Sequence, residues 1–119
     1  MLESEFQANL IKKIEDRLPG CIVLKNDPKY KRGIPDLLVL YEHKWAALEC
    51  KKHTKASHRP NQDYYIVRMN KMSFARFIRP ENEEEVLNEM EHTLKSSRTT
   101  RFPRRKQEQL VELRRRQVS

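Results

Sequence analysis

Two carboxylates and one ammonium group stand at the ends of two apolar runs, which a short polar turn separates. Asp36 opens the first run, and Glu49 and Lys51 close the second. The length of the turn predicts that the two runs pair as an antiparallel hairpin. Because side chains on a strand alternate between faces, Glu49 and Lys51 point one way while Leu48 and Cys50 point the other. Antiparallel pairing then brings Asp36 close to Glu49 and Lys51.

These charges predict a particular chemistry. Two carboxylates and an ammonium group at the edge of an apolar hairpin are costly unless they are paired or bind a metal ion. Hard oxygen ligands suit Mg²⁺ or Mn²⁺, which keep water ligands and accept further oxygens from a phosphate group. A neighbouring lysine can sense the metal's field, orient a water molecule or steady phosphate charge. The pattern therefore predicts a site that hydrolyses phosphodiester bonds.

The same residues resemble a known signature. Pro35-Asp36 followed by Glu49-Cys50-Lys51 resembles the motif of the PD-(D/E)xK nuclease superfamily. The small size of the chain and the residues around the motif are similar to the VRR-NUC group, which is close to the Holliday-junction-resolvase-like nucleases. The chain has only two glycines, so a glycine just before the Pro-Asp pair also suggests a turn with a special backbone requirement.

Two further matches make the resemblance more specific. Glu5 resembles the glutamate on the group's first helix; the helix alone favours an acid stabilised by the helix dipole, and the hairpin downstream favours contact with a metal ion or water. Gln62 resembles the glutamine that follows the ExK strand, where it would bond to the phosphate or to a catalytic side chain; its alternative is a surface glutamine. A Ser or Thr usually precedes Pro60 in the related nucleases, whereas this chain has Arg59. The resemblance covers roughly residues 3–94.

The resemblance implies a role for each matched residue. Asp36 and Glu49 would bind one or two Mg²⁺ or Mn²⁺ ions, together with the main-chain carbonyl of Cys50. Glu5 would complete the metal shell, directly or through water. Lys51 would orient or deprotonate the attacking water, or stabilise the pentavalent charge. No covalent intermediate is then needed.

Seven elements must position these residues. Apolar residues recur at helical spacing in three segments, and short apolar runs predict four strands, two of which form the hairpin. The predicted helices span 3–18, 60–71 and 82–94, and the other two strands span 21–24 and 73–79. Ser4 with Gln7 and Asn82 with Glu85 fit capping boxes. The order αβββαβα predicts an α/β fold with a mixed four-stranded sheet flanked by helices, and the resemblance implies a restriction-endonuclease-like core.

Composition limits the class of protein. The 119 residues suit one domain with a modest core, and 35% of them are charged, which favours a soluble protein over a membrane protein. No apolar run is long enough to span a membrane, and the acidic N-terminus is unlike a signal peptide. We expect a cytoplasmic protein in which Cys21 and Cys50 are buried free thiols; a disulfide is the alternative.

Charge is distributed unevenly. The net charge is +8, and residues 98–119 contain eight cations and two acids, which is +6 and leaves +2 for residues 1–97. This asymmetry favours a polyanionic partner, and DNA is the partner we expect. We divide the chain into a nuclease domain, 1–94, and a basic tail, 95–119. The expected DNA contacts are Lys29, Lys31, Arg32, Lys52, Lys55, Arg59, Arg104, Arg105 and Lys106.

The tail has three interpretations: an arm that grips DNA, a helix swapped between two copies of the chain, or a disordered segment. We expect disorder without nucleic acid and contact with DNA when bound. By analogy with the resolvase-like relatives, a homodimer would supply two active sites for a branched structure such as a four-way junction. The functional alternative is a DNA-binding module without catalysis on the same fold. An adaptor that binds only protein would leave the site and the tail unexplained, and no CxxC or HxxxH spacing supports a zinc site.

Overall fold

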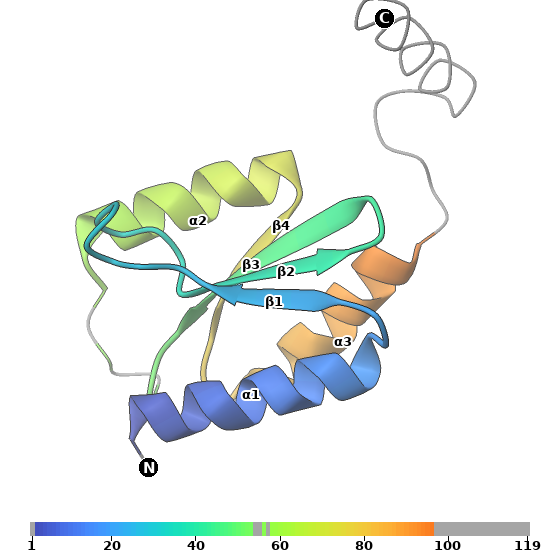
Figure 1. Ribbon diagram of the computed structural model, residues 1–119. Helices are drawn as coiled ribbons and strands as arrows, with labels where there is room; N and C mark the ends of the chain where they lie inside the picture. Colours follow the sequence, from blue (N-terminus) through green and yellow to red (C-terminus); the bar gives the residue numbers. More distant parts are fainter. Residues whose placement is uncertain (1, 54–55, 57, 97–119) are drawn as a thin grey trace, which may run out of the picture.

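The computed structural model describes residues 2–53, 56 and 58–96. These residues form an α/β fold in which the elements follow the order αβββαβα (Figure 1). The elements are α1 (Glu3–Arg17), β1 (Ile22–Lys25), β2 (Leu37–Tyr41), β3 (Lys44–Cys50), α2 (Pro60–Met72), β4 (Phe74–Ile78) and α3 (Glu83–Lys95). All seven predicted elements are therefore confirmed, with ends that differ by only a few residues.

The sheet is mixed, and its strands lie in the order β1-β2-β3-β4. The first three strands form an antiparallel meander, and β4 pairs parallel to β3 after the α2 crossover. In the β2–β3 hairpin Leu37 faces Leu48 and Tyr41 faces Lys44. Glu42 in the tight connection has a positive φ of 55°, a conformation that is uncommon for a residue with a side chain. The predicted antiparallel hairpin is confirmed.

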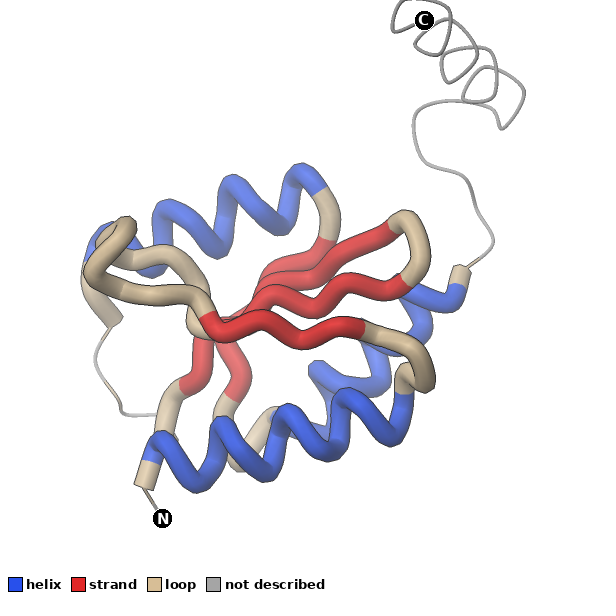
Figure 2. The backbone as a smooth tube through the Cα atoms, viewed as in Figure 1, coloured by secondary structure: helices blue, strands red, loops and turns tan. Residues whose placement is uncertain are grey.

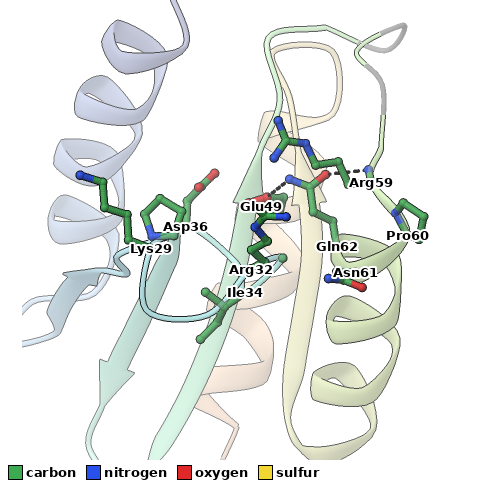
Figure 3. A pocket seen from close by; sticks show the side chains of 11 residues that line it. Lys29, Arg32, Ile34, Asp36, Glu49, Arg59, Pro60, Asn61 and Gln62 are labelled. Atoms are coloured by element: carbon green, nitrogen blue, oxygen red, sulfur yellow. Dashed lines mark hydrogen bonds between the residues drawn. The ribbon is translucent and has the colours of Figure 1, made fainter.

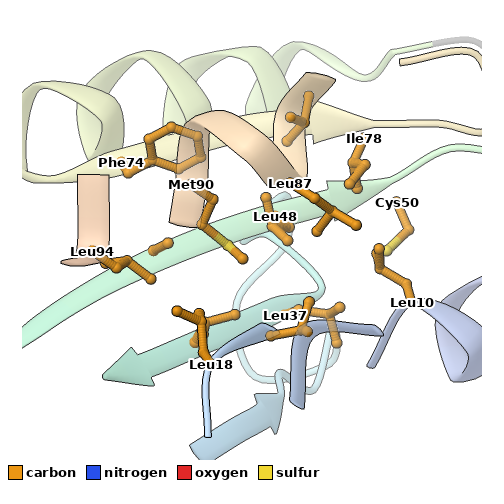
Figure 4. Close-up of a cluster of buried hydrophobic side chains, with 14 of the residues drawn as sticks. Leu10, Leu18, Leu37, Leu48, Cys50, Phe74, Ile78, Leu87, Met90 and Leu94 are labelled. Carbon is orange, nitrogen blue, oxygen red and sulfur yellow. The ribbon is translucent and has the colours of Figure 1, made fainter. Parts of the chain in front are cut away.

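Helices cover the sheet on both sides. Figure 2 shows α2 alone on one face, and α1 with α3 on the other, so that the fold has three layers. The main core fills the space between the sheet and the α1–α3 layer (Figure 4). From α1 it takes Phe6, Leu10 and Ile14, which recur every fourth residue as the helical pattern requires. Leu48 and Cys50 of β3 face the same core and are almost fully buried.

The opposite face has a smaller contact with α2. Here Ala47 and Ala75 present small side chains, and Ile66 of α2 packs onto them. Because alternate residues of β3 point to opposite faces, the residues after Ala47 that share its face are Glu49 and Lys51. The α2 side of the sheet therefore carries the predicted site residues, and the α1–α3 side carries most of the core.

Two details of the helix ends differ from expectation. No side-chain cap is formed at the start of α1, where Leu2 is the N-cap residue, so the predicted capping box of Ser4 with Gln7 is wrong. Asn82 does precede α3, but its side chain does not cap that helix. Its Oδ1 instead accepts the N–H of Arg79 at 2.8 Å and its Nδ2 donates to the carbonyl of Phe77, which fixes the turn after β4.

The remaining expectations are met in part. Cys21 and Cys50 are both free, as predicted, although Cys21 is only half-buried. None of the three described helices has the length and hydropathy that crossing a membrane would require. Lys55 and residues 97–119, with the tail cations Arg104, Arg105 and Lys106, lie outside the described part of the chain.

Candidate active site

The predicted trio forms at the end of β3. Asp36 directly precedes β2, and the pairing of Leu37 with Leu48 puts Asp36 beside Glu49. The main-chain N–H of Cys50 donates to Oδ2 of Asp36 at 2.9 Å, which fixes the carboxylate against the neighbouring strand. Asp36 is half-buried, whereas Glu49 is only 3% exposed and Lys51 only 8%. Among the described residues, Glu49 and Lys51 are the buried charged groups.

Gln62 joins these groups from the other layer. Its Nε2 donates to Oε2 of Glu49 at 2.9 Å, and its Oε1 accepts from Nζ of Lys51 at 2.7 Å. Oε1 also accepts the main-chain N–H of Arg59 at 3.1 Å, so the first turn of α2 holds the amide in this orientation (Figure 3). The Arg59 side chain has no acceptor atom, so it cannot accept a capping hydrogen bond from a main-chain N–H of α2. Gln62 therefore acts as a bridge between the carboxylate and the ammonium group.

The segment before α2 is held by an aromatic stack. The His58 ring stacks on Phe77 with a centroid distance of 4.1 Å, and its Nδ1 lies 3.1 Å from Oδ1 of Asp63. Phe77 is the β4 residue that pairs with Glu49. His58 thus fixes the chain just before Arg59 and Gln62, next to the site.

Burial leaves Glu49 with an incomplete set of partners. Its Oε1 is buried and accepts no hydrogen bond. Burial, and after it the neighbouring Asp36 carboxyl group, raises the pKa of Glu49 to about 9, and Lys51 opposes this rise only in part. The amide of Gln62 donates to Oε2 of Glu49 and leaves Oε1 without a hydrogen bond. A cation bound between Asp36 and Glu49 would stabilise that oxygen.

The donors of this pair fit a hard divalent cation. Mg²⁺ and Mn²⁺ prefer oxygen ligands and commonly need only one or two carboxylates, with water or phosphate oxygens completing the shell. The buried, unpartnered oxygen of Glu49 beside the Asp36 carboxylate supplies such a donor set. In the described part of the chain, no group of three or more His, Cys, Asp or Glu residues comes together as a metal centre. The fit therefore depends on two carboxylates.

A cavity of about 570 Å³ opens over Asp36 and Glu49. Its walls are the loop between β1 and β2 and the first turn of α2, which Figure 3 shows on either side of the carboxylates. Gly33 lets these walls meet: it has a φ of +85°, and a Cβ at this position would lie 2.4 Å from Cβ of Asn61. The glycine is required both by the backbone conformation and by the close approach.

A second cavity, of about 450 Å³, shares Arg59 and Gln62 with the first and reaches Lys51 and Lys52. The acid from α1 that lines it is Glu3. Glu5, which the sequence suggested, is exposed on the first turn of α1 and lines neither cavity. The part of Glu5 in the metal shell therefore stays a prediction, and Glu3 is the first-turn acid of α1 that lines the second cavity.

Of the predicted DNA contacts in the described part of the chain, four line the two cavities. Lys29, Arg32 and Arg59 line the first cavity, and Lys52 lines the second. Nζ of Lys31 lies 5.6 Å from the centre of the Tyr65 ring on α2. Cations thus rim the cavity that contains the two carboxyl groups.

The Cys50 side chain has no part in this centre. It points to the core with Leu48, and burial, followed by the charge of Asp36, raises the pKa of its thiol. A protonated, buried thiol is a poor nucleophile. Only the main chain of Cys50 is available to the site.

Sequence reasoning missed several residues that build the site. Asn26 holds both ends of the β1–β2 loop, because its Nδ2 donates to the carbonyl of Pro35 and its N–H to that of Asp36. Asn61 forms the surface that Gly33 contacts. An Asn after a strand and a Gly before Pro-Asp are weak signals alone, since the contacts that give them meaning join segments far apart in the sequence.

Comparisons with known protein families, with curated proteins and with solved structures find no match to this chain.

Replacing Gly33 by Ala should damage the site as well as the fold. A left-handed backbone costs a residue with a side chain about 1–2 kcal/mol, and the contact with Asn61 adds a clash. Gly20→Ala is the matched control, because Gly20 has a φ of +90° and open space around it. In urea unfolding, Gly33→Ala should lose more stability than Gly20→Ala, and only Gly33→Ala should shift the amide NMR resonances of Asn61 and Gln62. Equal losses without those shifts would contradict the close approach.

Stability without metal should depend on pH through Glu49. Its pKa rises from 4.5 to about 9 in the folded chain, so between these values the folded chain retains a proton that the unfolded chain releases. The free energy of unfolding should therefore decrease as pH rises through this range. Thermal unfolding in chelator measures this, and Glu49→Gln should show a smaller decrease because its amide does not titrate. Parallel profiles for the two proteins would show that Glu49 is not responsible.

Proposed function

We propose that this protein is a metal-dependent nuclease that hydrolyses phosphodiester bonds in DNA, on a restriction-endonuclease-like core of the PD-(D/E)xK superfamily and its VRR-NUC group. One observation carries the proposal. Asp36 and Glu49 meet in one cavity, and Gln62 bonds to both Glu49 and Lys51, so that two carboxylates and an ammonium group share one centre. Charges buried in this way are costly unless they have a use or a partner.

Each residue has a part in the proposed reaction. Asp36 and Glu49 hold the divalent cation, with the main-chain carbonyl of Cys50 as a further ligand. Such a cation, when bound, lowers the pKa of a water molecule and neutralises the charge that develops on the phosphate. The ammonium group of Lys51 orients or deprotonates the attacking water, or stabilises the pentavalent phosphorus. Gln62 fixes both Glu49 and Lys51 and so acts as a positioning residue.

The surrounding cations support a nucleic-acid substrate. Lys29, Arg32 and Arg59 line the cavity that contains the two carboxylates. Lys and Arg side chains at such positions contact phosphates and fix the register of the backbone without reading sequence. Such contacts would recognise DNA by its phosphate backbone and its shape rather than by its base sequence.

We further propose that the substrate is branched DNA, such as a four-way junction, and that two copies of the chain act together on it. The exposed side chains of Ile22 and Leu24, on the edge strand β1, support association through that edge. A two-fold symmetric pair of active sites would produce two related cuts in a symmetric junction.

The test is a cleavage assay on a labelled four-way junction, a matched linear duplex and single-stranded DNA. Each is incubated with Mg²⁺, with Mn²⁺ and with chelator. We expect metal-dependent cleavage that falls by about 100-fold or more in Lys51→Ala, because the variant lacks a charge aimed at the reacting phosphate. Lys13→Ala is the control, since Lys13 pairs with Glu83 on the opposite side of the sheet.

The pattern of products separates the parts of the proposal. Symmetric nicks at the junction would support a dimeric, branch-selective enzyme. Cleavage of all three DNAs would retain the nuclease and remove the preference for junctions. If every DNA is bound and none is cut with either metal, catalysis is refuted, and a DNA-binding module on the same fold takes its place.

A further inference from the structure

Tyr30 lies at the tip of the loop between β1 and β2 and is 86% exposed. This is the largest exposed fraction of any large hydrophobic side chain in the described part of the chain; the next, Leu2, is 62% exposed. A single exposed apolar residue is ordinary on a protein surface. The surroundings of Tyr30 decide whether it has a function.

Hydrogen bonds within the loop that carries Tyr30 fix its conformation. The main-chain N–H of Lys29 donates to Oδ1 of Asp27 at 2.8 Å, and that of Tyr30 donates to the carbonyl of Asp27 at 3.1 Å. Asn26 closes the base of the loop, and Gly33 presses the far side of the loop against the first turn of α2. Figure 1 shows this loop beside the start of α2. The ring is thus presented to solvent by a bonded turn, which lowers the entropy lost on binding.

A series of cationic and aromatic side chains in mutual contact runs from this loop along α2. Lys31 lies over the Tyr65 ring, and the Tyr64 ring meets Tyr65 edge-on with a centroid distance of 5.2 Å. The guanidinium group of Arg68 lies 5.6 Å from the Tyr64 ring centre and donates to its hydroxyl at 2.8 Å. We call this surface the aromatic strip; it consists of Tyr30, Lys31, Tyr65, Tyr64 and Arg68.

The strip begins beside the candidate active site. Tyr30 follows Lys29, which lines the cavity that contains Asp36 and Glu49, and the next cation of that cavity is Arg32. A nucleic-acid strand whose phosphate lies in the cavity would therefore have its adjacent nucleotides close to Tyr30. The cations on either side of the ring favour a polyanion over an apolar protein surface.

Aromatic rings between cations suit single-stranded nucleic acid. Cationic side chains follow the backbone, and exposed rings stack on bases whose faces are free. Bases inside a duplex are stacked on each other and offer no free face. We propose that the aromatic strip binds unpaired nucleotides next to the scissile phosphate, with Tyr30 stacking on the first unpaired base. The proposal rests on the proposed nuclease function and narrows its substrate to DNA that carries a single-stranded segment or an open branch point beside the cut.

The test measures binding of the full chain, in chelator so that no DNA is cut. The probes are a short single strand with 2-aminopurine and a duplex of the same sequence. Tyr30→Ala should weaken binding of the single strand by about 10-fold, because stacking on one base contributes this much, and should change duplex binding by less than about twofold. Tyr30→Trp should restore both affinity and the quenching of 2-aminopurine. Met72→Ala is the control, because Met72 is 60% exposed at the far end of α2 and outside the strip.

Two results would overturn the inference. If Tyr30→Ala weakens single strand and duplex equally, or weakens neither, Tyr30 does not select unpaired bases. A cleavage assay on the same variants then shows which proposal has failed. Metal-dependent cleavage that is unchanged in Tyr30→Ala would leave the nuclease standing without the strip, whereas a wild-type chain that neither binds nor cuts any DNA would refute both.

Discussion

The structure depends on how Glu49 and Lys51 are buried. Both project from the end of β3 toward α2 and are almost fully buried, and a buried charge is tolerated only with close partners. Gln62 supplies part of that requirement, since one amide donates to the carboxylate and accepts from the ammonium group. The remaining oxygen of Glu49, without a hydrogen-bond partner, sits beside Asp36. The free-energy cost of burying these polar groups is therefore concentrated at one place in the fold. A bound divalent cation would reduce that cost.

The layers of the fold separate these buried polar groups from the main apolar core. On the face shared by α1 and α3, large apolar side chains such as Leu10, Leu48 and Met90 form a continuous core. On the α2 face, alanines bring the helix close to the strands and leave the charged end of β3 near its first turn. Strand alternation alone separates the two environments, because neighbours on β3 face opposite layers. Most of the core and the candidate site thus lie on opposite sides of one strand.

Much of this could be predicted from the sequence, because local patterns determine it. The hairpin that joins Asp36 to Glu49 follows from two apolar runs and a short turn, and Pro60 at the start of α2 indicates the turn that carries Gln62. The rest depends on contacts between distant segments. Glu3 lines the second cavity and Glu5 does not, because the direction of α1 across the sheet decides which first-turn acid reaches it. The helical periodicity of the sequence indicates which face of α1 is buried, but not the direction in which α1 crosses the sheet.

The helix caps failed for a related reason. A capping box assumes that the side chain has no better partner, and Asn82 has one in the turn after β4. Arg59 stands where the related nucleases have Ser or Thr, and its main-chain N–H donates to Oε1 of Gln62, so the glutamine of the site also stabilises the start of α2. The proximity of Gly33 to Asn61 could not be anticipated either, since it joins a loop and a helix that only the folded chain brings together.

The central claim is that Asp36 and Glu49 together hold a divalent cation. Calorimetric titration of Mn²⁺ near neutral pH, in two buffers with different ionisation enthalpies, tests it directly. The account predicts saturable binding that releases about one proton per ion, because Glu49 retains a proton in the free protein. Binding should be lost in Asp36→Asn and retained in Asp16→Asn, because Asp16 is exposed near the end of α1, and proton release should vanish in Glu49→Gln. Binding that is absent, or that is unchanged in Asp36→Asn and Glu49→Gln, would contradict the account.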